Sequence, residues 1–130
     1  MHMARKPDIQ RTHLTRETLA RLAALPTDGH AVVSLYLDLD PARFTHLRDR
    51  YAELDSVLEA AERRALSETE LPRAERLALR GDLDQVREVI ANKEELAPQS
   101  ARGLAIFRSG PAGIFELVRL PRAVEPMAVI

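Results

Sequence analysis

Residues 31–41 read Ala-Val-Val-Ser-Leu-Tyr-Leu-Asp-Leu-Asp-Pro, and this stretch decides how the chain folds. The apolar residues at every second position are Val33, Leu35, Leu37 and Leu39. A period of two residues is typical of a β-strand that buries one face. Val32 and Tyr36 indicate that the opposite face is at least partly covered as well. We therefore predict a central strand over residues 31–40.

Two long amphipathic helices are predicted after this strand. Asp40-Pro41 is a strong helix start, because Asp caps the first turn and Pro suits the first helical position. Apolar residues then recur every three or four positions to about residue 66: Phe44, Leu47, Tyr51, Leu54, Val57, Leu58, Ala61 and Ala65. The polar connection 67–70 separates this helix from a second one that begins at Pro72, and together the two helices form an αα-hairpin.

The second helix carries its own apolar stripe and ends before Pro98, which bars any extension. The positions assigned to its buried face are Leu77, Leu79, Leu83, Val86, Val89 and Ile90. Gly81 lies within the helix, where glycine costs about 1 kcal/mol relative to alanine. We read this glycine as a sign of a bend or of close packing.

The remaining elements are shorter. A helix is predicted after the N-cap residue Thr15, with Leu19, Leu22, Ala23 and Leu25 as its apolar stripe and an end at Pro26. Strands are predicted at 102–109 and 114–120, joined by a tight turn over Gly110–Gly113. A last short strand is expected at 127–130.

Burying these apolar faces together gives an α+β fold. We predict a small, mostly antiparallel sheet of three to four strands packed against the long αα-hairpin, with an additional N-terminal helix. The other face of the sheet then needs that first helix or a partner. Residues 1–130 fit a single domain with an ordered core over about 14–130. Because residues 124–130 are an apolar ending, we expect this to be the N-terminal domain of a longer multidomain protein.

Composition excludes several classes of function. The chain has 19 Lys and Arg against 20 Asp and Glu, a net charge of −1, so no overall field attracts nucleic acid. The absence of Cys removes disulfides, thiolate nucleophiles and zinc–thiolate sites. The N-terminus has no apolar signal-peptide core, and no apolar run is long enough to span a membrane. We expect a cytoplasmic protein without a membrane partner.

Residues with catalytic chemistry are scattered. Asp38 and Asp40 have a spacing that can hold a divalent cation, but Pro41 favours a helix cap instead. His13, His30 and His46 stand alone, without the partners of a catalytic triad. Ser34 has no nucleophile elbow around it. We therefore predict no catalytic residue, no metal site and no cofactor in these residues.

The arginines near the tip of the helical hairpin are the candidate RNA contacts: Arg63, Arg64, Arg73, Arg76 and Arg80. Guanidinium groups on an exposed tip can bind phosphates. The interleaved acidic residues Glu62, Glu68, Glu70 and Glu75 favour the alternative, a salt-bridged face in solvent. No aromatic side chain lies among the arginines, so base stacking is not indicated.

Three segments together resemble a known family: 32–38, 102–107, and 115–117 with the residues on to 124–126. Their order and apolar signature resemble the N-terminal domain of archaeal and eukaryotic class-1 peptide-chain release factors. They are most similar to the bacterial branch, which is grouped with peptidyl-tRNA hydrolases of stalled ribosomes. The resemblance covers about 31–130. It implies a domain that binds at the small ribosomal subunit, while a following domain carries the catalytic Gln.

Two motifs of the codon-reading relatives do not match. The stretch 65–73 has no Asn-Ile-Lys-Ser loop, and residues 107–113 have no Tyr-x-Cys-x-x-x-Phe pattern. Codon reading is therefore not implied. Our first hypothesis is a non-catalytic domain that positions a peptidyl-tRNA hydrolase domain on the ribosome or tRNA through the hairpin tip. The alternative is a protein-interaction or oligomerisation module without an RNA role, such as a homodimer.

Overall fold

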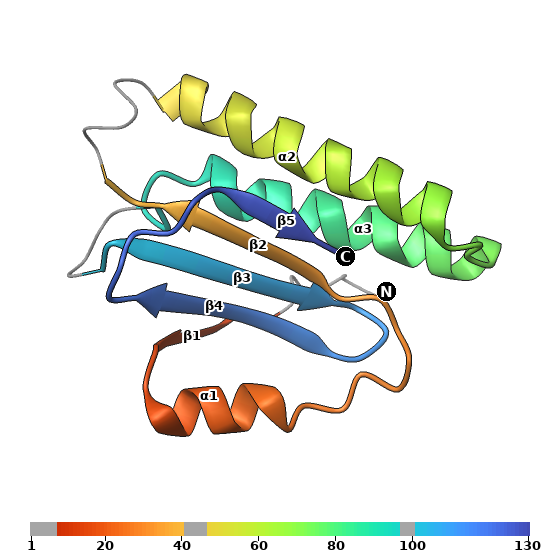
Figure 1. The fold of residues 1–130 in the computed structure, drawn as a ribbon, viewed down its shortest axis with the longest axis horizontal. Coiled ribbons are helices and arrows are strands. Elements are labelled where there is room, and N and C mark those ends of the chain that lie inside the picture. Colours follow the sequence, from red (N-terminus) through yellow and green to blue (C-terminus); the bar gives the residue numbers. More distant parts are fainter. Residues whose placement is uncertain (1–7, 41–46, 97–100) are drawn as a thin grey trace, which may run out of the picture.

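A computed structural model of the chain describes residues 8–40, 47–96 and 101–130. It contains five strands and three helices (Figure 1). In chain order they are β1 (Gln10–His13), α1 (Arg16–Ala23), β2 (Val33–Asp38), α2 (Leu47–Glu68), α3 (Arg73–Ala91), β3 (Gly103–Ser109), β4 (Ile114–Leu120) and β5 (Met127–Val129).

The strands form one mixed sheet in the order β1-β4-β3-β2-β5. Strand β1 runs parallel to β4, and the other neighbours are antiparallel. The α+β class is thus confirmed, whereas the prediction of three to four mostly antiparallel strands is wrong. The strand that the prediction missed is β1, which reads Gln-Arg-Thr-His and carries no alternating apolar signal.

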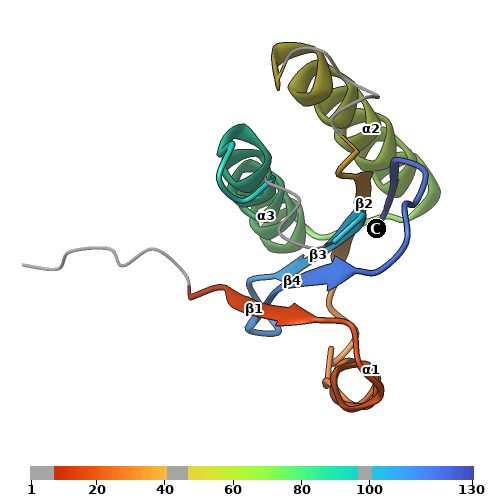
Figure 2. The same cartoon turned by 90° about the vertical axis from the view of Figure 1, so that its left-hand side faces the viewer.

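The hydrophobic core lies between the sheet and the two long helices, which cover one of its faces (Figure 2). One row of paired residues crosses four strands and is fully buried: Ala128, Leu35, Ile106 and Leu117. Leu58 of α2 and Leu83 of α3 pack into the same core. The predicted central strand is therefore confirmed, with its alternating leucines buried.

Helix α3 confirms its predicted apolar stripe except at one position, Leu77. Leu79, Leu83 and Val86 are buried, but Leu77 is 61% exposed. Leu77 lies two residues from Leu79, which places it on the opposite side of a helix with 3.6 residues per turn. Gly81 is also exposed, and nothing lies within 4 Å of a Cβ built on it. The helix continues through Gly81, and the close packing suggested for this glycine is not found.

Pro41 and Phe44, at the predicted start of this helix, fall outside the described residues, and α2 is described from Leu47. Within the part that the structure describes, α2 turns Leu54, Leu58 and Ala61 toward the core as predicted. None of the described helices is long and apolar enough to cross a membrane.

Helix α1 lies on the other face of the sheet (Figure 2). Its predicted cap is confirmed, because the Thr15 hydroxyl accepts a hydrogen bond from the Thr18 N–H at 3.1 Å. Its predicted apolar stripe is wrong in part, since no residue of α1 is buried and Leu19 is 58% exposed. An ion pair from Arg21 to the buried Glu116 of β4 ties the helix to the sheet.

The turn between β3 and β4 is the predicted glycine hairpin, and α3 supports it. Gly113 has a φ of 70°, and its N–H donates to the Gly110 carbonyl at 3.1 Å. The buried Asp82 of α3 accepts a hydrogen bond from the Gly110 N–H at 3.0 Å. Arg108 lies 3.4 Å from the same carboxylate, so the turn is fastened by a charged pair inside the protein.

Asp82 gives the stability of the fold a specific pH dependence. Burial raises the pKa of Asp82, while the Gly110 hydrogen bond and the charge of Arg108 oppose this rise. A raised pKa in the folded state means that protonated Asp82 favours folding. This contribution to stability is present at low pH and is lost as the pH rises through the folded pKa. The stability of Asp82→Asn relative to the native chain should therefore increase from about pH 4 upward. Urea unfolding from pH 3.5 to 7 measures this, and a constant difference would contradict it.

Two glycines should respond oppositely to alanine. A Cβ on Gly103 would lie 2.5 Å from the Arg122 carbonyl oxygen, a backbone atom that cannot move aside cheaply. Gly103→Ala should therefore destabilise the fold by about 1–3 kcal/mol. Gly81→Ala meets no atom and should stabilise α3 by about 0.5–1 kcal/mol. Thermal and urea unfolding of the two variants test both signs.

Candidate functional site

The five candidate arginines lie on the two long helices, on either side of the turn that joins them. Arg63 and Arg64 belong to the last turns of α2, and the other three begin α3. All five side chains are exposed. The structure thus keeps them near one end of the helical pair, as the sequence predicted, but divides them between two helices with different surroundings.

Arg73, Arg76 and Arg80 form one row along α3, because the spacing i, i+3, i+7 repeats on one side of a helix. No ion pair joins these three or Arg63 to any residue within 8–40, 47–96 and 101–130. The predicted salt-bridged face is therefore not formed among the described residues. Arg64 differs from the rest, since it donates a hydrogen bond to the Ala128 carbonyl of β5 at 3.2 Å.

Glu75, one of the interleaved acidic residues, binds a histidine instead of an arginine. The His30 Nδ1 lies 3.1 Å from the Glu75 carboxylate. Both residues line a cavity of about 600 Å³ between the helix turn, β5 and the segment before β2. Arg64 and Glu68 are also part of its wall, and its apolar side includes Ala61, Leu71 and Ile130. Sequence reasoning missed this pair because the two residues are far apart in the chain and no motif links them.

The cavity holds no described nucleophile beside the histidine. Its only hydroxyl side chain is Thr69, for which no hydrogen bond to His30 is found among the described residues. No group of three or more His, Asp or Glu residues within the described ranges could hold a metal ion. A His–Glu pair alone orients an imidazole but does not make an acyl- or phosphoryl-transfer site.

The carboxylates of Asp38 and Asp40 lie near a buried arginine. The Asp38 Oδ1 accepts a hydrogen bond from the Asp40 N–H at 2.8 Å. Burial lowers the pKa of Arg50, and the charges of Asp38 and Asp40 oppose this effect. A guanidinium group thus supplies the positive charge that a divalent cation would otherwise bring. The alternative role, Asp40 as a helix cap, concerns residues outside the described part of the chain.

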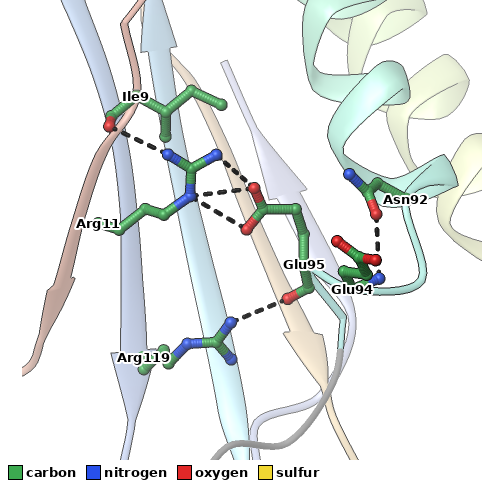
Figure 3. Close-up of polar contacts among 6 residues, drawn as sticks. All are labelled: Ile9, Arg11, Asn92, Glu94, Glu95 and Arg119. Atoms are coloured by element: carbon green, nitrogen blue, oxygen red, sulfur yellow. Dashed lines mark hydrogen bonds and ion pairs between the residues drawn. The ribbon is translucent and has the colours of Figure 1, made fainter.

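A second polar cluster lies where the end of α3 meets the edge of the sheet (Figure 3). The Arg11 guanidinium of β1 binds both carboxylate oxygens of Glu95, with Nε at 3.0 and 3.2 Å. Arg119 of β4 donates to the Glu95 backbone carbonyl at 3.2 Å. The hydrogen bond to Glu95 raises the pKa of Arg11, so this arginine stays charged. Arg11 and Arg119 both bind Glu95, so these contacts hold β1 in place. We call Arg11, Glu95 and Arg119 the Arg11 clamp.

The Arg11 clamp was missed because it depends on β1, which sequence patterning did not predict. It borders a polar cavity of about 350 Å³ that also includes His13, Asn92 and Glu94. The three single histidines lie in different surroundings. His13 is exposed beside this cavity and His30 pairs with Glu75, whereas His46 falls outside the described residues.

No protein-family model matches the chain, and no curated protein matches it either. The resemblance to release factors therefore remains a hypothesis from the sequence, and function has to be argued from the surfaces described above.

The clamp makes a local prediction. Arg11→Ala should lower the free energy of unfolding by no more than about 1 kcal/mol, because the side chain is half exposed. It should nevertheless accelerate amide exchange in residues 10–13, since β1 is an edge strand held mainly from one side. Hydrogen exchange with mass spectrometry checks this, with the exposed Arg16→Ala as the control. Unchanged protection of 10–13 would contradict the clamp.

Proposed function

We propose that this domain docks a peptidyl-tRNA hydrolase domain of a longer chain onto the ribosome or its tRNA. In this proposal α2 and α3 act as an αα-hairpin whose tip carries the contact. The domain itself contributes position and no catalytic group. The homodimer or protein-interaction module is the competing function.

The observation that carries the proposal is that Arg63, Arg73, Arg76 and Arg80 enter no ion pair within residues 8–40, 47–96 and 101–130. A salt-bridged face would have joined them to the neighbouring glutamates, but Glu75 is bound to His30. Unpaired guanidinium groups are available to phosphates, which bind arginine through two hydrogen bonds at once. The net charge of −1 means that attraction comes from this local surface rather than from the whole molecule.

Co-sedimentation of the 130-residue chain with ribosomes across a salt series tests the proposal. Arg73→Glu with Arg76→Glu should weaken association by at least about tenfold and reduce the salt slope by about 2, because two phosphate contacts are lost. A matched control, Arg16→Glu with Arg122→Glu, makes the same change of net charge at two other exposed arginines.

An equal loss of ribosome association in the control variant would show that the effect comes from overall charge, and no association at low salt would contradict the proposal.

The competing module is favoured by a different observation. Met127 and Val129 of β5 are each 50% exposed on the face that lies opposite the core, near the half-buried Tyr36. Sedimentation equilibrium of the native chain and of Val129→Ser distinguishes a dimer through that face from a monomer.

A further inference from the structure

The exposed side of α3 near its N-terminus has a composition that the monomer does not explain. We call it the α3 outer surface, and its six exposed residues are Arg73, Ala74, Arg76, Leu77, Arg80 and Gly81. Two of them stand out: Leu77 was predicted to be buried but is exposed, and Gly81 has open space around it. Neither residue contributes to the core of the single chain.

The helical rotation of about 100° per residue orders this surface around Leu77. Leu77 points away from the side of α3 that buries Val86. The three arginines lie along one flank of Leu77. Ala74 and Gly81 lie along its other flank, so a charged row and a strip of small residues run side by side with one leucine between them.

The arginine row has no acidic counterpart on this surface. Glu75 is tied to His30, and the next exposed acid, Asp84, is bound to Arg87 at 3.3 Å. Within the described residues the three guanidinium groups enter no ion pair. Their positive charge is therefore open to a partner, and a complementary partner must be acidic.

Leu77 is the most exposed of the large apolar side chains in the described part of the chain, at 61%. Gly81 has open space around the position of a Cβ. A glycine on an exposed helix lets another backbone come close, and packed helices approach to about 8–10 Å depending on the side chains between them. The apolar part of the surface thus fits a helix that lies across α3.

We propose that the α3 outer surface docks an acidic amphipathic helix of a partner protein. The partner's carboxylates face the arginine row, an apolar side chain packs on Leu77, and its backbone crosses at Gly81. RNA phosphates would satisfy the arginines but would offer nothing to Leu77. An apolar centre beside arginines is instead typical of protein interfaces. This inference goes beyond ribosome docking and does not require it, and because both partners would use Arg73 and Arg76, the helix and the ribosome would bind in turn and not together.

Fluorescence anisotropy with a labelled peptide that repeats Glu-Leu-Ala-Glu-Ala-Leu-Glu tests the proposal on the 130-residue chain. Leu77→Ser should weaken binding about tenfold, as expected for a central contact, without changing the salt dependence. Gly81→Gln should raise Tm, because a Cβ at this position has no atom within 4 Å and glycine is a poor helix former, and should also weaken peptide binding about tenfold. Leu19→Ser, at another exposed leucine, is the matched control.

Three results would overturn the proposal. The peptide fails to bind the native chain, or Leu77→Ser and Leu19→Ser bind it equally well. The third is a hairpin RNA that binds this surface with the same sensitivity to Leu77→Ser as the peptide, which would assign the surface to RNA. Loss of ribosome association alone leaves the peptide result standing, so the two proposals fail separately.

Discussion

The burial of one face of β2 is the constraint on which the rest of the structure depends. Leu35 pairs with Ile106 on one side and with Ala128 on the other, and all three are buried beneath the long helices. A one-residue shift of β2 would turn its leucines to the opposite face. The register of β2 therefore fixes its two neighbours, and through them the position of the helices that cover the sheet.

Elements that bury a periodic apolar face were predictable, α1 was predictable from its cap residue Thr15, and β1, which has neither signal, was not. The alternation in β2, β3 and β4 and the stripe of α3 from Leu79 onward follow directly from burial. Strand β1 has no apolar period and is held by backbone pairing to β4 and by Arg11 on Glu95. Leu77 is the opposite case, a residue that was predicted to be buried and is exposed. An apolar residue close to a buried stripe is assigned to that stripe as long as the orientation of the helix is unknown.

The same distinction applies to the candidate sites. The arginine positions near the turn between α2 and α3 follow from helix boundaries, so the sequence could place them. Whether their charges are neutralised depends on partners that are distant in the chain. Glu75, for example, binds His30 and not one of these arginines. A net charge near zero likewise averages over the molecule and hides a row of three arginines on a single helix face.

Helix α1 has a consequence for the order in which the domain loses structure. It buries none of its residues, and Arg21 reaches a Glu116 carboxylate whose removal from water is itself costly. Such an element opens at a free energy well below that of global unfolding. We therefore expect two levels of protection from amide exchange in the native state. In the opened state the sheet face beneath α1 would be hydrated, while β2, β3 and the long helices would remain folded.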